Sequence, residues 1–559
     1  MIEARDVDKP ASPVSFWPRW LPLAVIWAIA ALVMLPELIG GPSYSFSFRY
    51  NFIWAGEFSR LFLAGDPWPR WLPGLWDGLG SPSFYFYPPL YFWVVALVRA
   101  TSFATLSIAT ATSVATLIIL AFSGMGMRAW LNGVASEKAA LVGAIGYMLA
   151  PYHLDDIYTR GALAEVSAYA VLPLVMIALK RLVTIGRSSD VALLALAYAL
   201  LILCHLPIAL LASVTLLPLA MLWWAWRGGR MPLLWHCSLA IVLGVGLTAC
   251  YWFPALALRH YTSWSAMGGD FFRIDRWFFF TKNWWQVSFP VFLTLAASLF
   301  ALSAFVKSRS GDIPLWVCLI LFSALLVSGA LPFVWKLPGL REVQFAWRLL
   351  AVVEFAVVTL LVVACPRLTQ PLTLGGMMAL FAAIGIMLVT TTNRVKAGWN
   401  YGNIGRATAL SNMAEAPEYL PAGYPIGYDE WGRADPGQFD PPSVPLAQAT
   451  GAERIDAIST RDGGMVVRVR SDAPVRVVAR RFFFPGWVAS NGKTVIQTVP
   501  HGRDRLVSWM APAGTHAFRL YRERPAAEII GLIVSTLSMS VLLALALYRR
   551  SKHIFTFGR

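Results

Sequence analysis

Residues 191–226 read VALLALAYALLILCHLPIALLASVTLLPLAMLWWAW, without a single Asp, Glu, Lys or Arg. A helix that crosses the hydrocarbon core of a bilayer needs about 20 mostly apolar residues. The stretch is long enough for two such helices, and His205 and Pro207 mark a tight turn between them. It therefore predicts two membrane-spanning helices, over 189–205 and 207–226.

The same character extends along the whole chain of 559 residues. Hydrophobic residues make up 57% and charged residues 14%, whereas an ordinary soluble domain carries about 25% charged residues. This composition excludes a soluble globular protein and a disordered one, and it predicts a polytopic, all-α membrane protein. About twelve spans are expected, over 20–39, 104–126, 138–152, 164–182, 189–205, 207–226, 232–255, 289–306, 313–332, 346–365, 370–391 and 527–548.

The short apolar stretch 88–98, which opens with Pro88-Pro89, decides the orientation of the chain. If it crossed the membrane, the short basic loops would fall on both sides. If it is a re-entrant or interfacial helix, all of these loops and both termini face the cytoplasm, as the excess of Lys and Arg in cytoplasmic loops requires. That excess explains the net charge of +16, and no nucleic acid is expected as a partner.

The segment 392–526 differs from the rest of the chain. Its first half is rich in Pro, Gly and Asp, and its second half alternates apolar and polar residues as in Met465 to Arg470. Asn491-Gly492 is a hairpin signal. We expect a small extracytoplasmic β-sandwich before the last span. The expected parts are 1–19 (cytoplasmic N-terminus), 20–391 (membrane domain with outer loop 40–103), 392–526 (β-rich domain), 527–548 (last span) and 549–559 (cytoplasmic tail).

A charged cluster follows the span over 138–152. Asp155 and Asp156 are adjacent, Arg160 follows four residues later, and Glu165 opens the next helix. One interpretation is an ion pair of Asp156 with Arg160 at a helix end. The other is a general base or metal-binding carboxylate in a partly desolvated cleft, with Arg160 holding a phosphate. The sequence favours neither.

Further candidates lie at the predicted outer ends of spans. His205 occupies the turn between two spans, where a lone histidine is more often structural. Arg341 and Arg348 would either extend to the interface or bind a lipid phosphate. Glu354 lies about two turns deeper in the same helix and is a functional candidate because ionisable groups are rare there.

The first outer loop is dense in aromatic residues, Gly and Pro. It contains Arg70-Trp71 and the run Phe84 to Leu90, with Tyr85 and Tyr87. One interpretation is a surface loop anchored at the interface by its aromatic rings. The alternative is a shaped backbone that lines a site, which the Gly and Pro beside fixed charges favour.

Several of these motifs, in this order, resemble those of one group of bacterial membrane proteins. They are Gly65-x4-Arg70-Trp71, Gly78-x-Gly80-x-Pro82, Phe84-x-Phe86-Tyr87-Pro88-Pro89-Leu90, Ala150-Pro151-Tyr152, Tyr158-x-Arg160-Gly161-Ala162-x3-Glu165, Gln344-Phe345-x-Trp347-Arg348 and Pro485-Gly486-Trp487. The chain resembles the 6-pyruvoyl-tetrahydropterin-synthase-related and YfhO-type membrane proteins of the GT-C glycosyltransferase superfamily. The pterin name implies no pterin chemistry.

The resemblance implies a GT-C-like fold with juxtamembrane helices in the first outer loop. It also implies transfer of a sugar, with inversion, from a polyprenyl-phosphate donor to an extracytoplasmic envelope glycan or lipid. A carboxylate would deprotonate the acceptor hydroxyl, while basic residues or a divalent metal, Mg²⁺ or Mn²⁺, stabilise the departing phosphate. The expected location is the bacterial inner membrane, with the active face periplasmic. The expected partners are the lipid-linked sugar, membrane lipids and the acceptor.

For this chemistry the chain offers three sets of residues. The catalytic candidates are Asp156, Asp155 and Glu165, and Asp155 and Asp156 are also the candidate metal ligands. The candidates for binding the donor phosphate are Arg160, Arg348, Arg341 and His205. Those for binding the sugar or acceptor are Arg70, Trp71, Tyr85, Tyr87 and Asn51.

One departure from the family pattern leaves the activity open. Related proteins begin the first loop with an Asp followed four residues later by a His, and the corresponding positions here are Ser47 and Asn51. Either the base lies elsewhere, at Asp155, Asp156, Glu57 or Asp66, or the protein has lost transferase activity. The rivals to an enzyme are therefore a flippase or accessory subunit that handles the same lipid, and a scaffold for envelope assembly.

Overall fold

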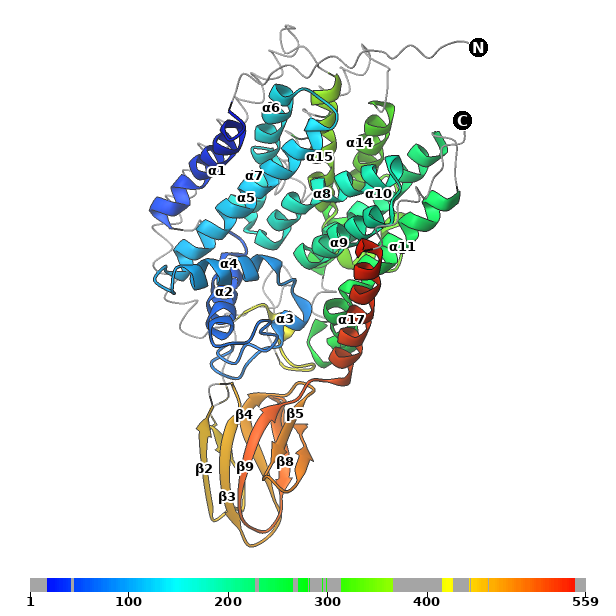
Figure 1. Ribbon diagram of the computed structural model, residues 1–559. Helices are drawn as coiled ribbons and strands as arrows, with labels where there is room; N and C mark the ends of the chain where they lie inside the picture. Colours follow the sequence, from blue (N-terminus) through cyan, green and yellow to red (C-terminus); the bar gives the residue numbers. More distant parts are fainter. Residues whose placement is uncertain are drawn as a thin grey trace, which may run out of the picture.

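The computed structural model places a helical bundle above a β-sandwich, and both ends of the described chain lie in the bundle (Figure 1). The residues that the structure describes are 18–41, 45–226, 231–264, 270–279, 281, 294, 298, 313–364, 415–425, 442, 444–460 and 462–547. The predicted spans over 289–306 and 370–391 lie almost entirely outside these residues.

The helices of the bundle follow the apolar runs of the sequence. They are α1 (Leu21–Gly40), α2 (Phe48–Leu63), α3 (Ser83–Phe86), α4 (Leu90–Thr101), α5 (Ile108–Asn132), α6 (Glu137–Met148), α7 (Pro151–Asp155), the π-helix η1 (Asp156–Arg160), α8 (Leu163–Thr184), α9 (Ser188–Cys204), α10 (Leu206–Trp226), α11 (Met231–Leu247), α12 (Ala249–Leu258), α14 (Ile313–Ser328), α15 (Leu350–Ala364) and α17 (Ala526–Leu547). Short 3₁₀ helices cap the loops between them, η2 (Arg259–Tyr261), η4 (Asp270–Phe272), η5 (Ile274–Trp277), η7 (Val334–Lys336), η8 (Leu340–Val343), η9 (Ala346–Leu349) and η10 (Pro417–Tyr419).

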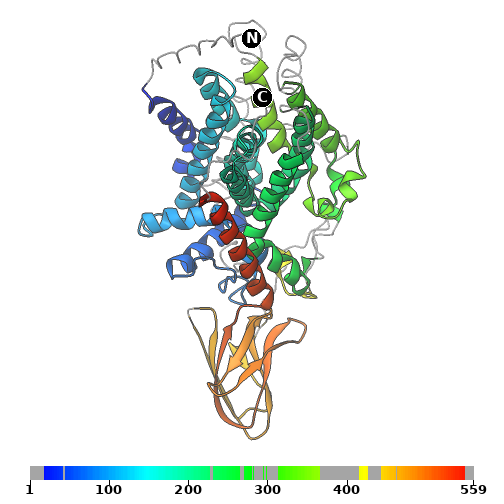
Figure 2. The same ribbon diagram turned by 45° about the vertical axis from the view of Figure 1, so that its right-hand side comes forward.

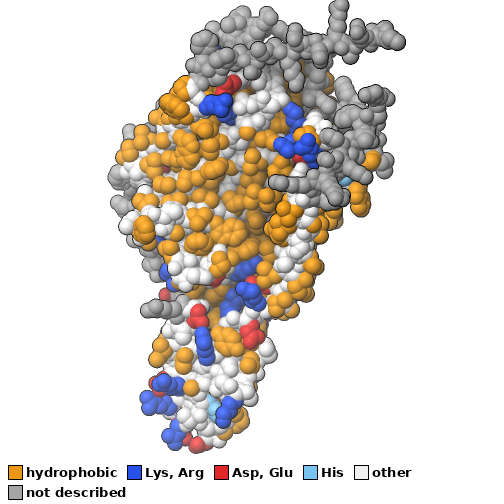
Figure 3. All heavy atoms as spheres, in the orientation of Figure 1, with side chains coloured by type: hydrophobic (Ala, Val, Ile, Leu, Met, Phe, Trp, Pro, Cys, Tyr) orange, Lys and Arg blue, Asp and Glu red, His pale blue; other side chains and the backbone are white. Residues whose placement is uncertain are grey.

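Five helices among the described residues are long and apolar enough to cross a membrane. They cover Leu21–Gly40, Ile108–Asn132, Leu163–Thr184, Ala346–Val363 and Ala526–Leu547, and the pair Pro232–Leu247 and Ala249–Tyr261 forms a sixth candidate with a bend of 65°. The number of about twelve spans stays a prediction. Hydrophobic side chains cover the visible face of the bundle, while charged ones gather near its two ends and on the sandwich (Figure 3).

The stretch that opens with Pro88-Pro89 forms α4, which has 12 residues and is shorter than the span that a bilayer requires. It lies across the lower end of α5, rather than alongside it, in both views (Figures 1 and 2). Helix α2 packs against α4. This arrangement agrees with the expected juxtamembrane helices of the first outer loop.

The second half of 392–526 forms the predicted β-sandwich. One sheet has the order β1-β4-β8-β7 and the other β2-β3-β9-β5-β6. Asn491-Gly492 joins β5 to β6 as an antiparallel hairpin, so this prediction is confirmed. The strands are β1 (Ala447–Gln448), β2 (Arg454–Ser459), β3 (Met465–Ser471), β4 (Val475–Phe482), β5 (Trp487–Ser490), β6 (Val495–Gln497), β7 (Val499–His501), β8 (Leu506–Ala511) and β9 (Gly514–Arg522).

The sandwich is attached to the first loop through backbone and side-chain contacts of β4. The Phe482 N–H donates to the carbonyl of Leu79 at 2.9 Å, and the Arg481 guanidinium donates to the carbonyl of Gly78 at 2.9 Å. Arg480 pairs with Asp77. The Trp76-Asp77-Gly78 motif is therefore a docking turn for the sandwich, and positive φ angles at Trp76 and Asp77 show how sharply the chain bends there.

Candidate functional site

The connection between α6 and α8 is a broken helix that positions the predicted charged cluster. Pro151 opens α7, where its missing N–H costs no hydrogen bond. The chain continues as the π-helix η1. This helix ends at Gly161, whose φ of 62° lies in the left-handed region. π-Helical turns are rare and often mark functional sites. The break places Asp156, Arg160 and Glu165 within reach of one another.

Two arginines converge on one carboxylate in this cluster. Arg160 pairs with Asp156 and, at 3.2 Å, with Glu165. Arg348, at the start of the membrane-length helix over 346–363, reaches the same Glu165 at 3.5 Å. The carboxylates are sealed from solvent, whereas Arg160 and Arg348 are 12% and 13% exposed. The side of the cluster that stays accessible is therefore cationic.

A second layer of hydrogen bonds holds the cluster rigid. The Tyr152 hydroxyl donates to Glu165 at 2.6 Å. Glu354 accepts from the backbone N–H groups of Tyr152 and His153 and from the hydroxyls of Tyr169 and Thr294, at 2.7 to 3.2 Å. Glu354, the candidate within the predicted span, thus fixes the start of the broken helix through these hydrogen bonds. It supports the residues around the arginines and forms no ion pair with either arginine among the described contacts.

Asp156 is an internal counter-charge in this geometry. Its side chain is fully buried, its pKa is raised by burial, and its Oδ2 atom has no hydrogen-bond partner among the residues that the structure describes. Of the two interpretations of Asp156 and Arg160, the ion pair is present, and its burial distinguishes it from an ordinary helix-end pair. Asp155 lies beside it and is also buried. Their catalytic role stays a prediction.

Arg348 lies in η9, just after the sharp turn that separates η9 from η8. Gln344 adopts a φ of 68°, which is uncommon for a residue other than glycine and marks a constrained position. Phe345 stacks on Trp347 with ring centroids 4.5 Å apart, and Trp277 packs edge-on against Trp347. Among the described residues the Trp347 Nε1 donates no hydrogen bond, so one buried donor beside the cluster is available to a ligand, while the Arg348 Nε faces Glu165 at 3.5 Å.

The first loop meets the cluster at the positions where the family pattern has its Asp and His. The Ser47 N–H donates to the carbonyl of Arg160 at 3.0 Å, and the Asn51 amide donates to the carbonyl of Gly161 at 2.5 Å. Tyr87 is close enough to Arg348, Glu165 and Arg160 for electrostatic interaction. Asn51 and Tyr87 therefore join the cluster, as a substrate-binding role would require.

Three other predicted sugar-binding residues lie in a different place, at the joint between the first loop, β9 and α17. Arg70 pairs with Glu528 at 3.6 Å, and the Tyr85 hydroxyl donates to Glu528 at 2.8 Å. Arg522 of β9 lies over the Trp71 ring at 4.7 Å. The structure does not bring Arg70, Trp71 and Tyr85 together with Asp156.

The two remaining phosphate-binding candidates differ in position. His205 lies within electrostatic range of Glu165, Arg348 and Arg160, and it is buried. Arg341 is 72% exposed and pairs with its neighbour Glu342 at 3.4 Å. His205 thus belongs to the cluster. Arg341, seven residues before Arg348, lies on the surface and does not.

The cluster offers few of the side chains that bind a divalent metal. Within the described ranges, no group of three or more His, Cys, Asp and Glu side chains is arranged to hold a metal ion. Asp156 already neutralises Arg160. The expected role of Asp155 and Asp156 as metal ligands stays a prediction, and no step below passes through a metal.

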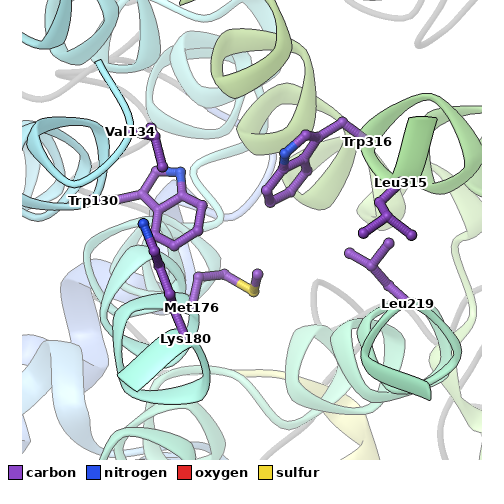
Figure 4. Close-up of a pocket in the computed structure, with 7 residues that line it drawn as sticks. All are labelled: Trp130, Val134, Met176, Lys180, Leu219, Leu315 and Trp316. Carbon is purple, nitrogen blue, oxygen red and sulfur yellow. The ribbon is translucent and has the colours of Figure 1, made fainter. Parts of the chain in front are cut away.

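A small pocket lies at the other end of α8, away from the cluster (Figure 4). Glu165 and Lys180 are 15 residues apart on this helix, which corresponds to about 22 Å along its axis. The lining residues are Trp130, Val134, Met176, Lys180, Leu219, Leu315 and Trp316. Lys180 donates to the carbonyl of Gly133 at 2.8 Å, so its ammonium group is already engaged, and we assign the pocket no role.

Residues 84–401 match the 6-pyruvoyl-tetrahydropterin synthase related domain, a family of membrane proteins. The chain belongs to this family. The family that the motifs indicate is thereby confirmed, and the apolar helices agree with a membrane protein.

Solved structures of three proteins are similar to the chain. Arabinofuranosyltransferase AftD from mycobacteria is 16% identical, with a TM-score of 0.41 over 69% of this chain and 27% of that one. ArnT from Cupriavidus metallidurans, bound to undecaprenyl phosphate, is 16% identical, with a TM-score of 0.31 over 70% and 64%. Arabinosyltransferase EmbB from Mycobacterium smegmatis is 13% identical, with a TM-score of 0.38 over 93% and 64%. The chain thus spans from about a quarter to just under two thirds of the length of these proteins. Among curated proteins, none matches the chain.

Sequence reasoning missed two acidic residues that the fold brings close to the first loop, Glu415 and Glu418. Both lie in the Pro-rich half of 392–526, where no periodic pattern marks a helix or strand. The signal that could have identified them is the pair of carboxylates three residues apart in Glu415-Ala416-Pro417-Glu418. Ser83 and Trp54, the first-loop residues that donate hydrogen bonds to Glu415, are 332 and 361 residues away from it in sequence.

Proposed function

We propose that the protein is a GT-C-like membrane glycosyltransferase. It transfers a sugar from a polyprenyl-phosphate donor to an extracytoplasmic glycan or lipid of the cell envelope, with inversion at the anomeric carbon. The observation that carries this proposal is the convergence of Arg160 and Arg348 on the single carboxylate Glu165. Membership of the family supports it, as do the motifs that the chain shares with such transferases.

The arrangement suits the phosphate of a lipid-linked sugar. Guanidinium groups bind phosphate through several N–H donors in a fixed plane. When the bond between the sugar and the phosphate breaks, negative charge grows on the phosphate oxygens, and fixed cations in a poorly solvated place stabilise that charge most strongly. Asp156 and Glu165 hold the two guanidinium groups in position, so little reorganisation is needed during the reaction.

The surroundings of the arginines provide the other two features that such a donor requires. The rings of Phe345, Trp347 and Trp277 form an apolar wall beside Arg348. The Trp347 Nε1, which has no hydrogen-bond acceptor among the described residues, offers a contact to a phosphate or sugar oxygen. We assign Asn51 and Tyr87 to the sugar or acceptor because the first loop carries them to the same cluster.

We also propose that the protein lies in the bacterial inner membrane, with both termini cytoplasmic and the sandwich and cluster periplasmic. The basic short loops support this orientation. The first loop contacts both the cluster and the sandwich, so the two belong to one side of the membrane in this proposal.

The proposal can be tested in the host by mass spectrometry of extracted polyprenyl-linked sugars. Wild type, a deletion strain and strains carrying Arg348→Ala or Arg454→Ala are compared at equal expression. The deletion and Arg348→Ala should accumulate one polyprenyl-phosphate monosaccharide, and Arg454→Ala, an exposed residue of β2, should not. No accumulation in the deletion strain would refute the polyprenyl-sugar proposal.

A second candidate function is a flippase or accessory subunit that handles the same lipid without chemistry. It is favoured by one observation, that Ser47 and Asn51 stand beside Arg160 where the family pattern has an Asp and a His. Purified protein in detergent, given the accumulated lipid and a membrane extract from the deletion strain, would separate the two. Consumption of the lipid supports the enzyme, whereas binding without consumption supports the alternative.

A further inference from the structure

Three carboxylates contact the arginines or the groups around them, and all three are buried and engaged in ion pairs or hydrogen bonds; the Asp156 Oδ2 that lacks a partner among the described residues is sealed from solvent. Asp156 and Glu165 neutralise Arg160 and Arg348, and Glu354 accepts four hydrogen bonds. A base that removes a proton from an acceptor hydroxyl must be accessible and must have a free lone pair. The transfer reaction proposed above therefore needs a carboxylate from another part of the chain.

The short segment 415–425 supplies such a group and is held by two other parts of the chain, residues 261–263 and the sandwich. The Ser263 N–H donates to the carbonyl of Leu420 at 2.8 Å, and the Ala422 N–H donates to the carbonyl of Tyr261 at 2.9 Å. Arg505 of the sandwich donates to the carbonyl of Ala422 at 2.9 Å. A catalytic group on a loop needs this kind of support to hold its position.

Glu415 anchors the segment to the first loop. Its side chain is fully buried and accepts hydrogen bonds from Trp54 and from the Ser83 hydroxyl, the latter at 2.7 and 2.9 Å. Tyr419 stacks on Phe86 with ring centroids 5.8 Å apart. With its lone pairs occupied, Glu415 is a positioning residue.

Glu418, three residues later in η10, differs from Glu415 in both respects. It is half-buried, and among the described residues no other side chain or backbone group donates a hydrogen bond to its carboxylate. It lies within electrostatic range of Tyr87, and Tyr87 is within the same range of Arg348, Arg160 and Glu165. Glu418 and the arginine cluster therefore share Tyr87 as a common neighbour.

We propose that Glu418 is the general base that accepts the proton of the acceptor hydroxyl, in place of the first-loop carboxylate that this chain lacks at Ser47. The inference rests on the proposed glycosyltransferase function. Inversion requires the acceptor and the leaving phosphate on opposite sides of the anomeric carbon, so the base and the arginines must be separate groups, and both lie within electrostatic range of Tyr87.

The step balances as a substitution. The acceptor O–H proton moves to the Glu418 carboxylate, and the acceptor oxygen forms a bond to the anomeric carbon. The bond between that carbon and the phosphate oxygen breaks, and its electron pair leaves with the polyprenyl phosphate, whose charge Arg160 and Arg348 balance. Glu418 later releases its proton to water, so no oxidant or further reactant is needed.

The surroundings of Glu418 give it a suitable basicity. Burial raises the pKa of Glu418 to about 7, and burial likewise raises the pKa of Glu415 to about 7. The titratable groups that face it are Glu415 and Tyr419 on its own segment and Tyr87 from the first loop. A base that titrates near neutral pH is well matched to proton removal at that pH. The rate should rise with pH and level off above about 7.

The experiment uses the full-length protein in membranes and takes as its probe the polyprenyl-phosphate sugar that the deletion strain accumulates. Glu418→Gln should consume this lipid at least about 100-fold more slowly than wild type. The same variant, purified in detergent, should retain the co-purified lipid seen by mass spectrometry, because the arginines are intact. Glu418→Asp should recover part of the rate with a shifted pH profile. Glu415→Gln, the matched control, should lower the melting temperature more than Glu418→Gln does.

The outcomes separate this inference from the proposed function. If the deletion strain accumulates the lipid but Glu418→Gln consumes it within about threefold of the wild-type rate, Glu418 is not the base and the transferase proposal stands. A Glu418→Gln variant that is slow but also loses the co-purified lipid would show a binding role and would overturn the inference. If the deletion strain accumulates no lipid, the proposed function itself fails.

Discussion

The described part of the chain contains two clusters in which arginines, a glutamate and aromatic rings come together, and they have different surroundings. In one, Arg160 and Arg348 meet Glu165 within the helical bundle. In the other, Arg70 and Arg522 surround Tyr85 and Glu528 between the first loop, β9 and α17. We call them the bundle cluster and the joint cluster.

The difference lies in which parts of the chain supply the charges. The bundle cluster draws its charges from broken helix ends inside one domain, where Arg160 and Arg348 share Glu165. The joint cluster takes its charges from segments that are more than 400 residues apart and belong to two domains. The same residue types thus prepare a ligand site in one place and fasten two domains in the other. The following predictions test this distinction, from the largest expected effect to the smallest.

Arg160→Ala should have the largest effect because it leaves Asp156 and Glu165 buried, and Asp156 without its counter-charge. Breaking a buried pair in this way costs about 3–5 kcal/mol. Thermal unfolding in detergent should show a large drop in melting temperature. The double variant Arg160→Ala with Asp156→Ala should recover part of that loss, since no unpaired carboxylate remains at 156. An equal or larger loss in the double variant would contradict the buried ion pair.

Arg348→Ala should mainly reduce activity. Loss of one fixed cation at a developing negative charge lowers the rate by about 10²–10³-fold, measured as consumption of the accumulated polyprenyl-phosphate sugar. Glu165 keeps its pair with Arg160, so the protein should still fold.

The matched variant is Arg522→Ala in the joint cluster. It should keep the rate within about threefold. It should also make the sandwich easier to remove by limited proteolysis, because the joint loses a contact worth about 1–3 kcal/mol. If Arg522→Ala reduced the rate and Arg348→Ala left it unchanged, the joint cluster and not the bundle cluster would be the ligand site.

Gly80→Ala tests the packing of the joint cluster. Gly80 has a φ of 88°, and a Cβ atom there would collide with the Trp71 ring. Gly65→Ala is the control, since its φ is 101° and no atom lies within 4 Å of an added Cβ. Both variants incur backbone strain of about 1–2 kcal/mol, and Gly80→Ala should incur about 1–3 kcal/mol more from overpacking. Equal melting temperatures for the two variants would show that Trp71 does not pack there.

Arg454→Ala sets the baseline for an arginine that pairs with a carboxylate at the surface. Arg454 and Asp456 on β2 are 77% and 53% exposed, and such pairs contribute about 0–1 kcal/mol. The melting temperature and the transfer rate should change little. If Arg454→Ala destabilised the sandwich as much as Arg522→Ala does, burial would not explain why the arginines of the joint cluster contribute more than a surface arginine.

Much of the bundle cluster could be predicted because its residues are close in sequence. Asp156, Arg160 and Glu165 lie within ten positions, and helix geometry brings such residues together. The joint cluster was not predicted, because Arg522 and Glu528 are more than 430 residues from Tyr85. Arg70, Trp71 and Tyr85 look alike in sequence whether they bind a sugar or a neighbouring domain, since both use the same aromatic and charged contacts. Glu418 was missed for the same reason: its segment has no periodicity, and its neighbours are far away along the chain.

The sequence by itself determined that this is a membrane protein with an alternating, strand-rich region before its last helix. Apolar length and strand periodicity are local properties that bilayer thickness and sheet geometry translate directly into structure. Only the tertiary structure decided which arginines face a prepared site and which join two domains. It also decided that Asp156 is sealed within an ion pair, while the Glu418 carboxylate accepts a hydrogen bond from its own backbone and from no other described residue. Burial and partners decide what an ionisable group can do, and they depend on contacts between segments far apart in the chain.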